Sequence, residues 1–268
     1  MGATVVLVEG GWSTAAVYEP LIAQLGRRGV RAVASDLVDP ETGARMLMAS
    51  PRCSARLRAV LDGVDGPIVL AGHSGGGIDV TEVGDHPDVV HLVYMSAHMP
   101  GAEVDQSGLF DAIRPYLDID GPFVHFDPAG AREVFFEDLP ADQVDEAVDG
   151  LVPQVPLQGS VESADPSWRR RPSTYVVFDA DRAHPPERQM RWLPRPTMSF
   201  TSKAQGTSGS CLNPRRLRMS LRVLPRRSPD TTATLRRWER PVPKLPVGDG
   251  SLPPSDWKLA RVRHRCAR

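Results

Sequence analysis

Short apolar runs alternate with amphipathic segments along the first hundred residues. The runs resemble buried strands and cover residues 4–8, 31–37, 67–72 and 89–97. The segments between them carry apolar residues three and four apart, as helices with one buried face do, and cover residues 15–29, 44–64 and 78–86. Because parallel strands need such crossovers, the pattern predicts an α/β fold: a mostly parallel sheet with flanking helices.

The alternation stops after residue 100 and returns near residue 173. Residues 101–170 are rich in Asp, Pro and Phe and contain helix-like pieces, so we interpret them as a small inserted helical cap. Residues 173–181 (STYVVFDAD) read as another strand, and the prolines at the start of residues 185–192 are typical of a first helical turn. We therefore assign residues 1–192 to one core domain that carries the cap.

Residues 193–268 differ in composition from this core. They hold 17 of the 32 basic residues but only 4 of the 33 acidic residues, so the core carries −14 and the tail +13. They also hold 10 of the 26 prolines and show no sustained periodicity. This composition predicts a basic tail that is irregular or disordered.

The rest of the composition favours a soluble globular protein of a reducing compartment. The chain is 41% hydrophobic and 24% charged, as soluble globular proteins are, and no apolar run approaches the ~20 residues of a membrane helix. The first strand starts close to Met1, so we expect no signal peptide. The three scattered cysteines, Cys53, Cys211 and Cys266, fit a reducing cytoplasm better than a disulfide framework or a zinc site.

The segment Gly72-His-Ser-Gly-Gly76 matches the G-x-S-x-G pattern between a strand and a helix. In that turn the serine adopts a strained backbone, and the glycines avoid clashes with it. The hydroxyl of Ser74 would then project over the carboxyl edge of the sheet, while the N–H of Gly75 at the helix start could bind an oxyanion. No Lys-Ser/Thr follows the glycines, which argues against a phosphate-binding loop.

Four segments make residues 4 to about 191 similar to the α/β-hydrolase superfamily. They are VVLVEGGW, VLAGHSGGG, HPDVVHLVYMSAHMPG and STYVVFDADRAHPPERQ. Within the superfamily the chain resembles the small esterases that include plant methyl-ester hydrolases, hydroxynitrile lyases and their bacterial relatives. The resemblance implies an α/β-hydrolase fold, a serine-dependent ester hydrolase with small-molecule ester substrates, and no metal or organic cofactor.

The resemblance also implies site residues. Ser74 matches the nucleophile, Gly75 and Gly11 match the two oxyanion donors, and Asp181 matches the acid, with Asp179 as its close competitor. Relatives usually have His-Gly where this chain has Glu9-Gly10. We expect a carboxylate at position 9 to repel a developing oxyanion.

The family's histidine, expected roughly thirty residues after the acid, has no counterpart. The seven histidines are His73, His86, His91, His98, His125, His184 and His264, and none lies between the last two. We expect His184 to be a surface residue and His73 to point away from the site. His98 and His125 could line the pocket, although structural roles are expected for both, and His264 belongs to the tail.

One hypothesis explains both the change of net charge after residue 192 and the absence of the family's histidine. A slip of the reading frame near codon 191 would make residues 193–268 out-of-frame translation. If the codons after this point are read in the shifted frame, they can encode a helix end, an apolar strand and a Gly-His pair, in the order that the family shows. Sequencing the gene across codons 185 to 210 tests this hypothesis against a natural basic tail.

Two further functions remain open. The absent histidine and Glu9 favour a non-catalytic protein of the same fold that binds a small ligand. A nucleic-acid-binding arm at residues 193–268 is less favoured, because the arginines come with few aromatic residues and no recognition helix. Hydroxynitrile lyase chemistry stays possible within the esterase interpretation. The sequence indicates neither the substrate nor the oligomeric state.

Overall fold

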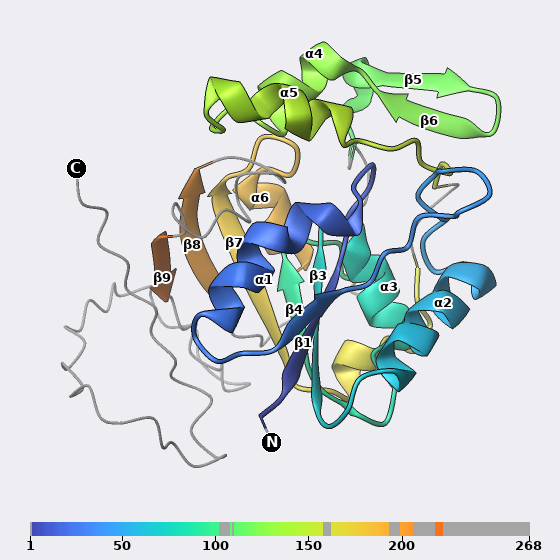
Figure 1. Ribbon diagram of the computed structural model, residues 1–268, viewed down its shortest axis with the longest axis vertical. Coiled ribbons are helices and arrows are strands. Elements are labelled where there is room, and N and C mark those ends of the chain that lie inside the picture. Colours follow the sequence, from blue (N-terminus) through green and yellow to red (C-terminus); the bar gives the residue numbers. More distant parts are fainter. Residues whose placement is uncertain are drawn as a thin grey trace, which may run out of the picture.

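The computed structural model describes residues 2–101, 108, 110–157 and 162–192, together with the strands at 199–205 and 218–221. Its central sheet has the strand order β2-β1-β3-β4-β7-β8-β9 (Figure 1). These strands are β1 (Thr4–Val8), β2 (Ala32–Ala34), β3 (Ile68–His73), β4 (Val89–Met95), β7 (Ser173–Ala180), β8 (Ser199–Gln205) and β9 (Arg218–Leu221). All neighbours pair in parallel except β8 and β9, which confirms the mostly parallel sheet.

Helices cover both faces of the sheet because side chains alternate along each strand. On one face, Val6 and Leu70 pack against α2 (Pro51–Asp62) and α3 (Gly76–Val83). On the other face, Leu7 and Ala71 pack against the 3-10 helix Ala15–Tyr18 and α1 (Glu19–Gly26). Strands β1 and β3 are therefore buried on both sides, which explains their continuous apolar runs.

Helix α2 is shorter than the helix expected over residues 44–64. Its first residue is Pro51, and the Ser50 side chain accepts a 3.2 Å hydrogen bond from the amide of Cys53. Serine at the cap and proline at the first helical position are a strong start signal. Residues 44–50 instead form an irregular segment with a turn at Ala49, in which Arg45 forms an isolated bridge to Gln154.

The cap lies over the carboxyl edge of the sheet (Figure 1). It contains the expected helices, α4 (Pro128–Val134) and α5 (Ala141–Asp149), and also a two-stranded hairpin, β5 (Leu117–Asp120) with β6 (Phe123–Phe126), that the sequence analysis does not predict. Its own apolar cluster includes Trp12, Phe126 and Phe135. The cap is therefore packed onto the loop that follows β1.

After β7, the chain forms the short helix α6 (Pro186–Gln189) and a 3-10 turn, Met190–Trp192. Two strands then lie in the segment expected to be irregular: β8 pairs with β7, and β9 pairs with β8. The rest of the predicted tail lies outside the described residues.

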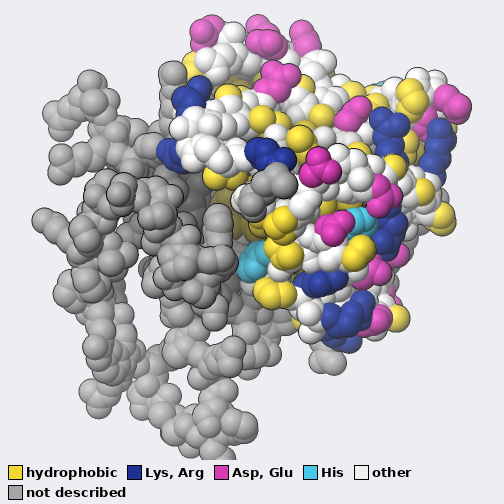
Figure 2. Space-filling view, turned by 60° about the horizontal axis from the view of Figure 1, so that its bottom comes forward, with side chains coloured by type: hydrophobic (Ala, Val, Ile, Leu, Met, Phe, Trp, Pro, Cys, Tyr) yellow, Lys and Arg dark blue, Asp and Glu magenta, His cyan; other side chains and the backbone are white. Residues whose placement is uncertain are grey.

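On the face shown in Figure 2, acidic and basic side chains lie interspersed over the described surface. None of the helices in the described ranges is long and apolar enough to span a bilayer.

Candidate active site

The sharp turn between β3 and α3 carries Ser74. Its φ is +50°, in the left-handed region that non-glycine residues rarely occupy. The glycines around it are required by close backbone contacts: a Cβ on Gly72 would lie 2.7 Å from the carbonyl oxygen of Gly76, and one on Gly76 would lie 2.6 Å from that of Val8. The turn therefore has the strained geometry that the G-x-S-x-G motif requires.

Ser74 opens into a cavity of about 50 Å³ beneath the cap. The polar side chains in its wall belong to Ser74, His73, His98, Gln154, Asp181 and His184. The apolar part of the wall comes from Trp12, Met48, Phe110, Ile113, Phe135, Leu157 and Ala183. Sequence segments more than a hundred residues apart thus meet at one point of the sheet edge.

Gly11 and Gly75 both line this cavity. The amide nitrogen of Gly11 lies 3.7 Å from the position that a Cβ on Gly75 would take, so the two backbone segments face each other beside Ser74. Met48 packs its sulfur against Gly75, and Gln154 points its amide oxygen, which has no hydrogen-bond partner among the described residues, at Gly11. Neither side chain is predictable from the sequence around Ser74, because each reaches the cavity from a distant loop.

Asp181 lies in the cavity wall, whereas Asp179 is exposed. The carboxylate of Asp181 accepts a 2.6 Å hydrogen bond from the Ser96 hydroxyl and a 2.7 Å hydrogen bond from the backbone amide of His184. Burial raises the pKa of Asp181 to about 7, against the lowering effect of these hydrogen bonds. The described residues place no histidine ring on this carboxylate.

His184 is buried, which corrects the expectation of a surface residue. Its Nδ1 lies 3.1 Å from the carbonyl oxygen of Ser96, and its Nε2 lies 3.3 Å from the indole nitrogen of Trp192. Because an indole N–H can only donate, Nε2 must be the acceptor and Nδ1 must carry the proton. Burial lowers the pKa of His184 to about 4, so the ring is neutral at pH 7.

Two more histidines border the cavity. His73 borders it, and its ring stacks on Phe178 with the centroids 6.1 Å apart. His98 is buried, and its Nδ1 has no hydrogen-bond partner among the described residues. His125 lies on β6 and is not part of this wall, while His264 lies outside the described residues.

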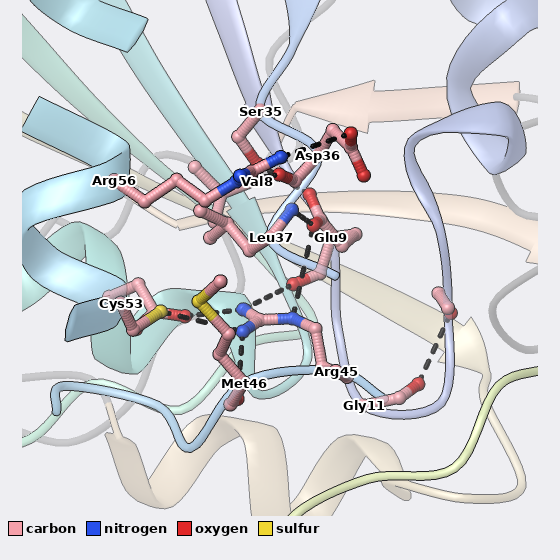
Figure 3. Close-up of polar contacts among 12 residues, drawn as sticks. Val8, Glu9, Gly11, Ser35, Asp36, Leu37, Arg45, Met46, Cys53 and Arg56 are labelled. Carbon is pink, nitrogen blue, oxygen red and sulfur yellow. Dashed lines mark hydrogen bonds and ion pairs between the residues drawn. The ribbon is translucent and has the colours of Figure 1, made fainter. Parts of the chain in front are cut away.

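Glu9 does not face the oxyanion donors. Its carboxylate is fully buried, accepts a 2.5 Å hydrogen bond from the Ser35 hydroxyl and another from the backbone amide of Leu37, and lies 3.9 Å from Nε of Arg45 (Figure 3). The expected repulsion of an oxyanion is therefore wrong, because the negative charge belongs to a separate buried network.

Arg45 is the centre of that network. Its guanidinium pairs with the carboxylate of Asp79 at 2.6 Å and contacts the Cys53 sulfur at 3.5 Å (Figure 3). Burial raises the pKa of Cys53 to about 12, so the thiol stays neutral. The second Asp79 oxygen accepts a 2.8 Å hydrogen bond from the amide of Ala49. The network thereby joins the β1 loop and residues 45–49 to helix α3, directly behind Ser74.

Comparison with known proteins places this arrangement among hydrolases. Residues 5–201 match the model of the Alpha/beta hydrolase family. Among curated proteins, no match to this chain was found.

Several solved structures have the same fold. A pyrethroid hydrolase from Sphingobium faniae JZ-2 has a TM-score of 0.67 at 22% identity, covering 80% of this chain and 93% of that one. Polyneuridine aldehyde esterase has a TM-score of 0.61 at 19% identity, covering 81% and 96%. A methylesterase from Arabidopsis has a TM-score of 0.59 at 20% identity, covering 79% and 92%. The family match spans most of the chain, and the protein belongs to the alpha/beta hydrolase family.

Proposed function

We propose that this protein is a serine esterase that hydrolyses small carboxylic esters. The observation that carries the proposal is the strained Ser74, which opens into a cavity also lined by Gly11, Gly75 and Asp181. The similar structures named as esterases and hydrolases support the same class of reaction.

The reaction would proceed by acyl transfer. The Ser74 oxygen attacks the ester carbonyl carbon, and the alcohol leaves with a proton from a base in the cavity. Water then attacks the acyl-serine and releases the acid. The amides of Gly11 and Gly75 would donate hydrogen bonds to the oxyanion formed in each step. Asp181 would supply a buried negative charge that offsets the protonated base.

The shape of the cavity favours a small acyl group. Its volume of about 50 Å³ is far below the 300–1,000 Å³ typical of sites for drug-sized ligands. Aromatic walls from Trp12, Phe110 and Phe135 suit an apolar substrate. We therefore expect acetyl esters of apolar alcohols to react faster than esters of long or charged acids.

The first prediction concerns Ser74. The full chain should hydrolyse p-nitrophenyl acetate, and Ser74→Ala should lower kcat/KM at least about a hundredfold, because the nucleophile is lost. Ser54→Ala is the matched control: Ser54 lies on α2 outside the cavity, and its hydroxyl has no hydrogen-bond partner among the described residues.

The opposite result would favour the second class of function. An unchanged rate in Ser74→Ala, or no turnover combined with saturable binding of the ester, would contradict the esterase proposal. Saturable binding without turnover is the behaviour of a non-catalytic ligand-binding protein of this fold.

A further inference from the structure

The acyl transfer proposed above needs a base for Ser74, and the family's histidine is absent from its expected place. Three buried histidines border the cavity: His73, His98 and His184. Each is neutral at pH 7, because burial lowers all three pKa values. A neutral imidazole has one nitrogen that can accept a proton, so the hydrogen bonds of each ring decide which one is free.

The acceptor nitrogen of His184 is already occupied. Its Nε2 accepts the indole N–H of Trp192, and its Nδ1–H donates to the carbonyl oxygen of Ser96. Trp192 is fully buried, so this hydrogen bond is shielded from water. To act as a base, His184 would first have to abandon the indole N–H, leaving a buried donor unpaired at a cost of about 1–3 kcal/mol.

His73 is held against the sheet. It is the last residue of β3, and its ring stacks on Phe178 of β7 with an angle of 27° between the planes. Its Nδ1 lies beside the loop after β1, 3.4 Å from the position that a Cβ on Gly10 would take. The ring is therefore packed between that loop and Phe178.

Among the described residues, neither ring nitrogen of His98 has a hydrogen-bond partner. Its Nδ1 is buried without a partner among the described residues, and no hydrogen bond within them engages either nitrogen of the ring. Most buried polar groups in proteins are satisfied, so such an atom in a cavity wall calls for an explanation. A ring that exchanges a proton with a substrate-bound nucleophile provides one.

The backbone of His98 is fixed beside the nucleophile. Its amide donates a 3.0 Å hydrogen bond to the carbonyl oxygen of Ser74. Its own carbonyl oxygen packs so closely on Gly77 of α3 that a Cβ there would clash. The two residues are therefore held together by the turn itself, although they belong to different strand–loop junctions.

Aromatic contacts fix the ring in the cavity wall. It stacks on Trp192 at 5.5 Å and meets Phe110 edge-on at 5.9 Å and His184 edge-on at 5.4 Å. No hydrogen bond joins the Ser74 hydroxyl to the ring in the described structure. Such contacts often form only when a substrate is bound.

We propose that His98 is the general base of the Ser74 reaction, in place of the family's histidine. As the serine oxygen bonds to the ester carbon, its proton passes to His98. The imidazolium then returns the proton to the departing alkoxide, which leaves as the alcohol. In the second half of the reaction, deacylation, His98 takes a proton from water as the water oxygen attacks the acyl-serine. His98 then returns that proton to the Ser74 oxygen. The balance is ester plus water to acid plus alcohol.

Burial lowers the pKa of His98 to about 3, so the ring is unprotonated at pH 7 but weakly basic. We therefore expect turnover well below that of an enzyme with a complete triad. General-base assistance is commonly worth about 10²–10⁴ in rate, and the loss of His98 should fall at the lower end of that range.

Three variants assayed with p-nitrophenyl acetate test this assignment. His98→Phe, which keeps an aromatic ring against Trp192, should lower kcat/KM about a hundredfold. His184→Gln can still donate to Ser96 and accept from Trp192, and it should lose less activity than His98→Phe. The matched histidine control is His91→Gln, because His91 lies on β4 outside the cavity wall, with its Nε2 2.9 Å from the Thr174 hydroxyl. It should stay within about fivefold of the parent protein. Circular dichroism and thermal melts check that each variant folds.

Chemical rescue gives a second readout that a packing defect would not produce. His98→Ala opens a space between Trp192 and Phe110. Added imidazole should restore at least a tenth of the lost rate, after subtraction of the hydrolysis that imidazole causes by itself, which is measured with Ser74→Ala. A parent-like rate in His98→Phe, a loss in His184→Gln or His91→Gln as large as that in His98→Phe, or no rescue would overturn the assignment of His98. The esterase proposal fails separately, if Ser74→Ala retains the parent rate.

Discussion

At the scale of single residues, what a side chain does depends on partners that come from distant parts of the chain. The serine turn was predictable, because strand, glycines and helix are contiguous around Ser74. The position of His184 was not, since its burial depends on Ser96 and Trp192, which reach it from another strand and from the turn after α6. Glu9 likewise looks unpaired until Ser35, Leu37 and Arg45 fold around it.

The position of Glu9 leads to a prediction about stability rather than rate. Glu9→Gln should leave kcat/KM within about threefold but lower the free energy of unfolding by about 1–3 kcal/mol, because one buried donor, Ser35 or Leu37, loses its acceptor. Urea unfolding and p-nitrophenyl acetate turnover measure the two effects. A large change in kcat/KM with unchanged stability would restore the view that this carboxylate acts on the oxyanion.

At the scale of helices and strands, periodicity predicted most of the core. The four expected strands of the first hundred residues, and the one at residues 173–181, all occur, because both faces of the sheet are buried and the runs are continuous. The start of α2 was misplaced, although Ser50-Pro51 is a recognisable start signal. Periodicity did not predict the hairpin β5–β6, because each of its strands has only four residues and β5 is mostly exposed.

Helix α3 also depends on a buried charge pair that periodicity cannot reveal. Asp79→Ala should lower the free energy of unfolding by about 3–5 kcal/mol, because it leaves the buried guanidinium of Arg45 without its closest partner. The control is Arg58→Ala, which breaks an exposed 2.7 Å pair with Asp85 between α2 and the end of α3 and should cost less than about 1 kcal/mol. Equal losses of unfolding free energy in the two variants would show that burial does not change how much an ion pair contributes to stability.

At the scale of the whole molecule, the sheet order and the cap follow from the family's architecture, whereas the end of the chain does not. Strands β8 and β9 lie in the segment that composition assigned to an irregular tail. A short strand that completes a sheet is stabilised by its neighbours rather than by its own sequence pattern. The reading-frame hypothesis for residues 193–268 remains a prediction for gene sequencing.

The three cavity histidines should make the whole protein sensitive to acid. Their pKa values are lowered in the folded state from 6.5 to about 4 for His73 and His184 and about 3 for His98, so unfolding at pH 5 takes up three protons. Asp181, whose pKa is raised to about 7, releases one. With a net uptake of between one and two protons over this range, stability should fall by about 2 kcal/mol per pH unit from pH 6 to pH 5.

Urea titrations at pH 5, 5.5 and 6 measure this slope directly. His184→Gln removes one titrating group and should reduce the slope by about 1 kcal/mol per pH unit. A slope near zero in the parent protein would mean that the histidines are solvated and that the cavity is not closed.

The central claim is that Ser74 is a working nucleophile in a chain without the family's histidine. The most direct test treats the full chain with a fluorophosphonate, which reacts only with activated serines, and locates the adduct by mass spectrometry. The account predicts one adduct per chain, on Ser74, its absence from Ser74→Ala, and its formation at a much lower rate in His98→Phe. An unreacted protein, or an adduct on another serine, would contradict it.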